Sequence, residues 1–271
     1  MIRTNDKQRD HDTTRVLGID YANLDYDGVV EKTAQWVDRR ESRYVAVAPV
    51  SNLMLAHTSA AHRESLREAD LITADGVPVV WTQRMLGHTD ATRVYGPTLM
   101  LKVLERAEKE GWQVGFYGGH PDRNPEMLKN LQEMYPNLRI AGCWSPPFRA
   151  LTDDELADYR RSMLDAGVQV LMVGIGCPKQ ERWMHENVGG LNTVMFGVGA
   201  AFDFHAGAVR QAPAFLQRAG LEWAFRLCME PRRLWKRYLT TVPPFMLAAA
   251  RQVLGARLTK RSYQVPQGST S

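Results

Sequence analysis

The stretch from Val168 to Asn187, VQVLMVGIGCPKQERWMHEN, limits the fold of this chain more than any other part of the sequence. Its apolar, β-branched start is typical of a strand buried on both faces of a parallel sheet. Gly174 and Gly176 allow a tight turn, and Pro178 suits the first turn of the helix that the later spacing predicts. Such a turn aims unpaired amides above the sheet and suits an anion, although an ordinary β–α junction has the same pattern.

The same alternation recurs along most of the 271-residue chain. Short apolar runs predict strands at 15–20, 44–50, 69–74, 112–117, 138–143, 168–173 and 193–196. Helical patterns of ten to fifteen residues separate most of them, which predicts right-handed βαβ units. We therefore expect an α/β fold with a Rossmann-like, mostly parallel sheet flanked by helices, followed by a basic helical C-terminal appendage. The expected divisions are a disordered tail at 1–15, the core at 16–207 and the appendage at 208–271.

Positive charge is concentrated at the C-terminal end. The formal net charge is +4, yet eleven basic and only two acidic residues follow Gly207, so the preceding part is net acidic. An amphipathic helix is expected over 221–238, where tryptophan and tyrosine alternate with cations. Such a helix suits a substrate, an anionic membrane surface or a homo-oligomer contact. A nucleic-acid reader is disfavoured because the main domain is acidic.

Other sequence features narrow the class of protein. Cys143, Cys177 and Cys228 are far apart, which indicates reduced thiols of a cytoplasmic protein. No apolar run approaches the roughly 18–20 residues of a membrane span, and the polar N-terminus lacks the apolar region of a signal peptide. No His, Cys and carboxylate cluster has metal-ligand spacing, so we expect neither a metal nor another cofactor. If a diphosphate binds, cations of the appendage must neutralise it.

Three polar residues are candidates for a site at the carboxyl ends of the strands, where open α/β sheets bind ligands. Asp75 directly follows an apolar run and could be a general base, or it could cap the next helix. Arg93 precedes a helix and could neutralise a phosphate, or it could be a solvated surface residue. Asp203 is expected near the end of another strand, where it could bind a ribose or a base, or stabilise its own turn.

The loop GFYGGHPD, beginning at Gly115, could also approach an anion through its glycine amides. It lacks both G-x-G-x-x-G and the Walker lysine, so neither a dinucleotide-binding fold nor a P-loop kinase is supported. A nicotinamide-dependent oxidoreductase is disfavoured for the same reason.

Taken together, several segments resemble the bacterial glycosyltransferases of the WecG/TagA/CpsF family. They occur in the family's order and cover roughly residues 16 to 240. The segments are DGVPVVW from Asp75, RVYGPTL from Arg93, GFYGG from Gly115, VGIGCPKQERW from Val173, GVGAAFDFHAG from Gly197 and APAFLQRAGLEWAFRLCMEPRRLWKRYL from Ala212.

This resemblance implies an inverting transferase that moves N-acetylmannosamine, its uronic acid or a related hexose from a UDP-sugar donor. The implied acceptor is a polyprenyl-pyrophosphate-linked saccharide at the inner face of the cell membrane, in cell-surface polysaccharide or exopolysaccharide synthesis. UDP-glucose is an alternative donor because WSPPF at 144–148 also suits family branches that move glucose. A lipid-surface-binding regulatory module is the alternative from another class.

The resemblance also implies roles for particular residues. Asp75 becomes the catalytic base, and Arg93 and Gln180 lie at the substrate. Many members have Thr-x-Asn where this chain has Val50-Ser51-Asn52, so Asn52 is retained as a substrate-binding candidate. Asp203 would lie near the uridine. The appendage is expected to fold over the site and to bring arginines to the diphosphate, namely Arg226, Arg233 and Arg237.

Overall fold

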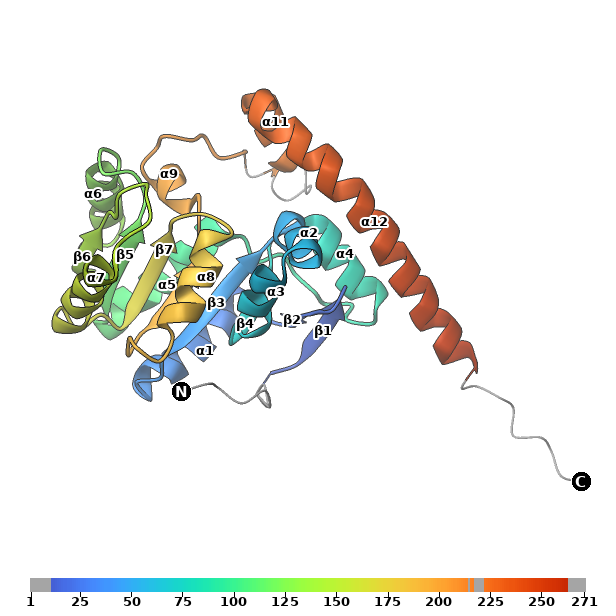
Figure 1. The fold of residues 1–271 in the computed structure, drawn as a ribbon, viewed down its shortest axis with the longest axis horizontal. Helices are drawn as coiled ribbons and strands as arrows, with labels where there is room; N and C mark the ends of the chain where they lie inside the picture. Colours follow the sequence, from blue (N-terminus) through green and yellow to red (C-terminus); the bar gives the residue numbers. More distant parts are fainter. Residues whose placement is uncertain (1–10, 214, 217–221, 263–271) are drawn as a thin grey trace, which may run out of the picture.

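The computed structural model describes residues 11–213, 215–216 and 222–262. Its centre is a six-stranded, fully parallel sheet with the strand order β4-β3-β8-β7-β5-β6 (Figure 1). The strands are β3 (Arg43–Ala48), β4 (Leu71–Ala74), β5 (Gln113–Gly118), β6 (Arg139–Trp144), β7 (Val170–Gly174) and β8 (Val194–Gly197). Each coincides with a predicted strand within two residues at either end, which confirms the predicted α/β class.

Helices cover both faces of the sheet, and each face has its own apolar core. The first face buries side chains of α2 (Val50–Thr58), α3 (Ala60–Arg67), α4 (Val77–Met85), α7 (Asp153–Asp165) and α8 (Lys179–Asn187). The second face buries side chains of α1 (Tyr26–Asp38), α5 (Gly96–Glu110), α6 (Asn124–Met134) and α9 (Ala201–His205). Continuous apolar strands are therefore explained by burial on two sides.

The topology leaves a crevice at the carboxyl edge of the sheet. The neighbouring strands β5 and β7 are followed by α6 and α8, which pack on opposite faces. Because the two connecting loops diverge, they leave room between them, and open α/β sheets bind ligands at such points. Gly118, at the end of β5, has a φ of +109°, and a Cβ there would lie 2.7 Å from the carbonyl carbon of Gly174. Glycine thus permits the close approach of the two strand ends.

The N-terminal region differs from the prediction. The strand expected at 15–20 is instead split between β1 (Thr13–Val16) and β2 (Ile19–Ala22), which pair antiparallel as a separate hairpin. Leu17 and Gly18 both have positive φ and form the turn. The predicted disordered tail at 1–15 overlaps β1, and residues 1–10 lie outside the described residues.

The C-terminal appendage is also divided where one helix was expected over 221–238. It forms α11 (Glu222–Met229) and α12 (Pro231–Ser262), separated by a bend at Glu230. Pro231 explains the division, because proline disfavours a helical residue before it and is well placed in a first helical turn.

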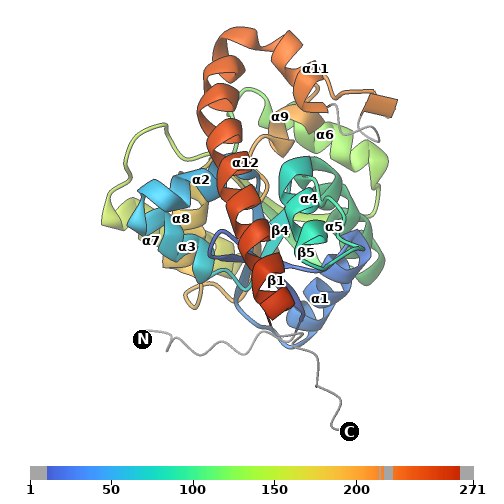
Figure 2. The same cartoon turned by 90° about the vertical axis from the view of Figure 1, so that its right-hand side faces the viewer.

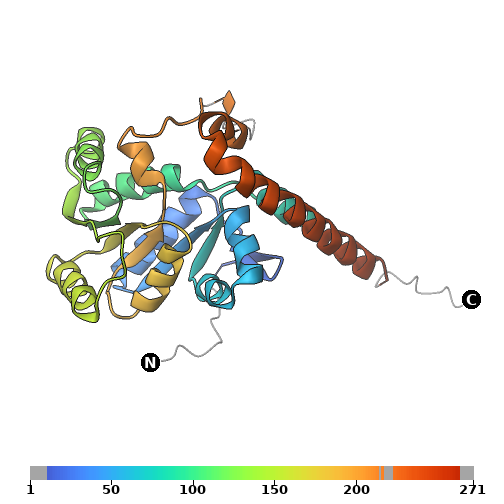
Figure 3. The same cartoon turned by 45° about the horizontal axis from the view of Figure 1, so that its top comes forward.

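The helix α12 is anchored on the core near its middle. Phe245 and Ala249 are buried beside α2 and α4, and Gln252 bonds the backbone of the hairpin. The Gln252 side chain accepts from the Leu17 amide at 2.8 Å and donates to the Arg15 carbonyl at 2.7 Å. Figures 2 and 3 show α12 crossing this side of the core, with its C-terminal end extending away from the sheet. Within the described part of the chain, no helix is both long and apolar enough to cross a membrane.

Candidate active site at the carboxyl edge

Three charges that are largely shielded from water meet where β4 ends. Arg93 donates to Asp75 Oδ1 from Nη2 at 2.9 Å and from Nε at 3.1 Å, and its Nη1 donates to Glu222 Oε2 at 2.8 Å. The three side chains are only 18 % (Asp75), 23 % (Arg93) and 5 % (Glu222) exposed. Asp75 makes no capping bond to α4, whose N-cap is Gly76, so the helix-cap alternative is wrong. Arg93 is likewise no solvated surface residue. The network links the core to the appendage, because Glu222 begins α11.

Burial has the largest effect on the pKa of Asp75. It raises the pKa of the carboxyl, the positive charges of Arg93 and Arg226 lower that pKa, and the negative charge of Glu222 raises it. The net shift is upward from the ordinary value. A carboxylate with a raised pKa holds a proton more firmly and is a better general base near neutral pH.

Two of the three predicted appendage arginines lie close enough to act electrostatically on the sheet edge. The charge of Arg226 lowers the pKa of Asp75, and its guanidinium lies 5.3 Å from the centroid of the Phe204 ring. The charge of Arg237 lowers the pKa of Cys177, in the loop between β7 and α8. Arg233 lies in α12 between them, and its side chain is outside the described part of the structure.

Asn52 and Gln180 meet at a third carboxylate, that of Glu181. The side-chain amides of Asn52 and Gln180 donate to Glu181 Oε1 at 2.9 Å and 3.1 Å. All three residues are buried. The Gln180 side chain lies against the turn after β8, since a Cβ on Gly197 would be 3.1 Å from its Nε2. The structure thus brings both predicted residues together from the first turns of α2 and α8, and their contact with a substrate stays a prediction.

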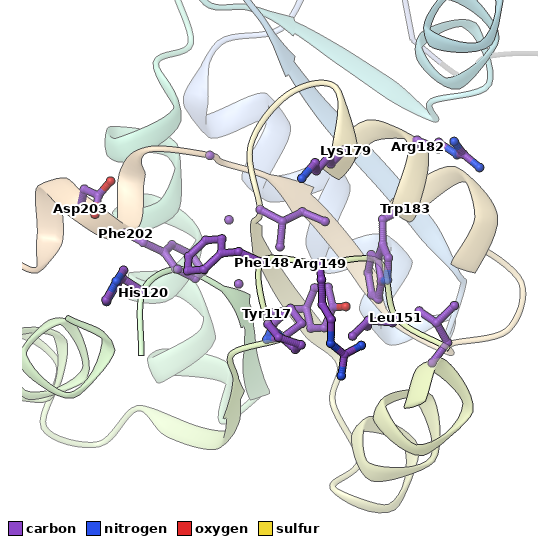
Figure 4. Close-up of a pocket in the computed structure, with 18 of the residues that line it drawn as sticks. Tyr117, His120, Phe148, Arg149, Leu151, Lys179, Arg182, Trp183, Phe202 and Asp203 are labelled. Atoms are coloured by element: carbon purple, nitrogen blue, oxygen red, sulfur yellow. The ribbon is translucent and has the colours of Figure 1, made fainter. Parts of the chain in front are cut away.

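A cleft of about 440 Å³ opens in the crevice between the ends of β5 and β7 (Figure 4). Its lining includes Gly118 and Gly119 after β5, Trp183 of α8, and the exposed Phe148 of the WSPPF loop. The volume falls in the range of small-molecule sites, about 300–1,000 Å³. Tyr117 stacks on Trp183 with ring centroids 4.3 Å apart, which makes one wall rigid and aromatic.

Asp203 also lines this cleft, although its position differs from the expectation. The strand β8 ends at Gly197, and Asp203 lies on the short helix α9. Its carboxylate accepts from Arg123 Nη1 at 2.9 Å, and both side chains are partly exposed. Asp203 is therefore held toward the cleft by an ion pair, and its contact with a ligand stays a prediction.

Cations at the sheet edge are not confined to the appendage, which corrects the sequence-based expectation. Arg123, Arg149, Lys179 and Arg182 line the cleft from the core. Each of the three arginines already pairs with a carboxylate: Arg123 with Asp203, Arg149 with Glu155 and Arg182 with Glu186. Of the four, only Lys179 has no ion pair within the described residues. Most of the positive charge needed to neutralise a diphosphate must therefore come from residues outside this cleft.

Sequence reasoning missed Glu222, Glu181 and Arg123 as members of the site. Glu222 is one of two acidic residues in a basic segment, and that isolation is the signal that could have identified it. Glu181 follows Gln180 in the glycine-turn motif, but its burial was not evident from spacing. Nothing in the sequence around Arg123 distinguishes it from a surface arginine.

Replacing Arg93 by alanine is predicted to lower the free energy of unfolding by about 3–5 kcal/mol, because it leaves Asp75 and Glu222 buried without their common partner. Urea unfolding followed by circular dichroism measures the loss. The control is Arg182→Ala, which removes an exposed pair with Glu186 and should change stability little. Equal stability of the two variants would mean that the buried network does not form in solution.

Comparison with known proteins agrees with the motif resemblance. The chain is 28 % identical over 243 residues to the N-acetylglucosaminyldiphosphoundecaprenol N-acetyl-beta-D-mannosaminyltransferase of Bacillus subtilis (strain 168), covering 85 % of this chain and 90 % of the relative. It is 29 % identical over 240 residues to the transferase of the same name from Staphylococcus aureus (strain MW2), covering 87 % and 91 %. The model of the "Glycosyl transferase WecG/TagA/CpsF family" matches residues 14–259, so it includes the core and most of α12. The chain therefore belongs to the WecG/TagA/CpsF family of glycosyltransferases.

Proposed function

We propose that this protein transfers N-acetylmannosamine, or a related hexose or hexuronic acid, from a UDP-sugar to a polyprenyl-pyrophosphate-linked saccharide, with inversion at the anomeric carbon. The product would serve cell-surface polysaccharide synthesis. The observation that carries the proposal is the Asp75–Arg93–Glu222 network, which joins a candidate base to the cationic appendage at the carboxyl edge of the sheet. The names of the relatives support the sugar and the lipid-linked acceptor.

The order of the strands suggests how two substrates would lie. The cleft between β5 and β7 suits the nucleoside of the donor, with Asp203 and the aromatic wall near its base and ribose. The N-terminal end of α8 adjoins this cleft and suits the diphosphate through the positive end of the helix dipole. Asp75 follows β4, and β8 and β3 lie between β4 and β7. The sugar would therefore lie between the cleft and Asp75, and the acceptor would approach from the β4 side.

The chemistry then requires one displacement. The acceptor hydroxyl oxygen forms a bond to the anomeric carbon while the bond from that carbon to the β-phosphate oxygen breaks. Asp75 takes the hydroxyl proton, and the leaving UDP takes the electron pair. Attack from the face opposite UDP inverts the configuration.

Negative charge develops on the departing UDP, and stabilising this charge is the main electrostatic requirement of the reaction. Arg226 and Arg237 act on the sheet edge from the appendage, as Lys179 can from the cleft. Fixed cations at the leaving group can replace a divalent metal in this role. We therefore propose transfer without a metal cofactor, in which case a chelator leaves the rate unchanged.

Within this proposal, the first prediction concerns Asp75. Asp75→Asn should lower kcat by about 100-fold or more, because a general base contributes about 10²–10⁴ in rate. UDP release and product mass are measured with UDP-N-acetylmannosamine, its uronic acid form and UDP-glucose, each with a lipid-diphosphate-linked acceptor. The matched control is Asp90→Asn on an exposed loop. Near-normal turnover of a folded Asp75→Asn protein would refute the base, and turnover with UDP-glucose alone would select the alternative donor.

The second prediction concerns pH. The negative charge of Glu222 raises the pKa of Asp75, so Glu222→Gln should lower that pKa. Asp75 would then lose its proton at lower pH, and the acidic limb of the kcat/KM profile should move to lower pH. Glu230→Gln removes a charge from the same appendage outside this network and should leave the limb in place. A limb that stays fixed or moves upward in Glu222→Gln would contradict the role of Asp75.

A membrane surface is the proposed location of the lipid-linked acceptor, on the cytoplasmic face. Several large apolar side chains of α12 are exposed at helical spacings of four, seven and eight residues, so they share one side: Trp235, Leu239, Met246, Leu254 and Leu258. Exposed arginines lie on the same helix, including Arg232, Arg251 and Arg257. A helix with exposed apolar and cationic side chains suits an anionic bilayer surface.

The third prediction tests this contact. Full-length protein should sediment with vesicles that contain anionic lipid, and less so at high salt. The double variant Leu254→Glu and Leu258→Glu should lose this binding because it places two carboxylates on the contact face. Leu164→Glu changes a similarly exposed leucine on α7 of the core and should bind normally. Equal vesicle binding by the double variant and by Leu164→Glu would show that α12 is not the membrane contact.

A further inference from the structure

We propose that His62, Cys177 and Glu181 form a binding site for a divalent transition-metal ion of the zinc type. One ligand atom from each residue, a ring nitrogen, Sγ and a carboxylate oxygen, lies within 4.8 Å of the other two. The residues come from α3, from the loop after β7 and from the first turn of α8. The sequence separates His62 from the other two by more than one hundred positions, so spacing could not reveal the cluster.

Three buried polar atoms of this cluster have no hydrogen-bond partner. His62 is 4 % exposed, and although its ring lies near the Asn52 backbone, neither nitrogen makes a hydrogen bond of good geometry. Glu181 is fully buried, its Oε2 has no hydrogen-bond partner, and no salt bridge reaches it from any described residue. An unpaired polar group in the interior costs free energy. A bound cation would satisfy both groups at once.

The geometry and the donor chemistry favour zinc over magnesium or calcium. Tetrahedral zinc with Zn–N of about 2.0–2.1 Å and Zn–S of about 2.3 Å places its donors about 3.3–3.8 Å apart. Separations of up to 4.8 Å exceed these values by at most about 1.5 Å, which is within the reach of side-chain rotation. Nitrogen and thiolate donors suit zinc or cobalt, whereas magnesium and calcium prefer oxygen. Cys177 is exposed, so an ion can enter from solvent and keep water as a fourth ligand.

Protonation does not prevent such binding. Although the residue as a whole is exposed, desolvation of its sulfur and the neighbouring Glu181 carboxylate raise the pKa of the Cys177 thiol. Coordination reverses this because a bound divalent cation deprotonates a thiol.

The position of the cluster makes this ion a regulator rather than a cofactor. Glu181 Oε1 holds the amides of Asn52 and Gln180, the two predicted substrate-binding residues. A metal that draws the Glu181 carboxylate toward His62 disturbs both amides. The expected consequence, which rests on the proposed function, is inhibition of sugar transfer by zinc.

The direct experiment adds Co²⁺ to the intact, reduced full-length protein and follows absorption. A thiolate-to-cobalt charge-transfer band should appear with a stoichiometry of one ion per chain. Cys177→Ser should abolish the band, whereas Cys228→Ser, which changes another exposed cysteine, should retain it. His62→Gln should weaken Zn²⁺ binding in calorimetry by at least about 10-fold, and His57→Gln, on the exposed side of α2, should not.

A missing charge-transfer band, or one that survives Cys177→Ser, would overturn the site. Because Cys177 is exposed, its serine variant is expected to fold, so the test does not depend on the buried His62. In the activity arm, Zn²⁺ should inhibit wild-type transfer, a chelator should reverse the inhibition, and His62→Gln should resist it. Cobalt binding with the expected variant pattern in a protein that transfers no sugar would support the metal site and refute the proposed function.

Discussion

The guanidinium of Arg93 is the interaction on which the arrangement of this molecule depends. It pairs with Asp75 of the acidic core and with Glu222 of the basic appendage, in a place largely shielded from water. Without Arg93, two carboxylates would be buried side by side, which is a costly state. Without Glu222, α11 would lose its charged contact with the sheet edge. One side chain thus pairs with a core carboxylate and fixes the start of the appendage.

The anchor at the other end of the appendage is of a different kind. Phe245 and Ala249 bury apolar surface against α2 and α4, and Gln252 completes the hydrogen bonds of the β1–β2 turn. Between these two anchors, the first turns of α12 bring Arg237 close enough to the loop after β7 for its charge to lower the pKa of Cys177. The uneven charge of the chain then has a structural explanation, because the net acidic core and the basic appendage lie against each other. Under the proposed function, the same arrangement stabilises a departing nucleotide.

The strands and the position of Asp75 could be predicted from the sequence because their causes are local. Apolar runs in the sequence predicted the strands. An aspartate directly after such a run had to lie at the carboxyl edge of the sheet, as Asp75 does. The hairpin turn at Leu17 and Gly18 was missed because a leucine with positive φ has no clear sequence signal. The bend before Pro231 was missed although proline is a known cause of such breaks.

Long-range pairing of charges was beyond sequence reasoning. The isolation of Glu222 in the basic appendage marks it as unusual, but its partner Arg93 lies 129 positions away and no sequence pattern links the two. Glu181 and His62 belong to helices whose exposed and buried sides depend on tertiary packing. Their buried, unpartnered atoms become evident only once α3 and α8 are placed side by side.

The central claim is that appendage cations act at the sheet edge, and the rate of UDP release tests it most directly. The measurement uses a short-chain, water-soluble lipid-diphosphate-linked acceptor, so that membrane binding does not contribute. The account predicts that kcat falls about 100-fold in Arg226→Ala and in Arg237→Ala. In Arg251→Ala, at an exposed position farther along α12, kcat should stay at the wild-type value. Equal rates in all three variants and the wild type, or an equal fall in all three, would contradict the account.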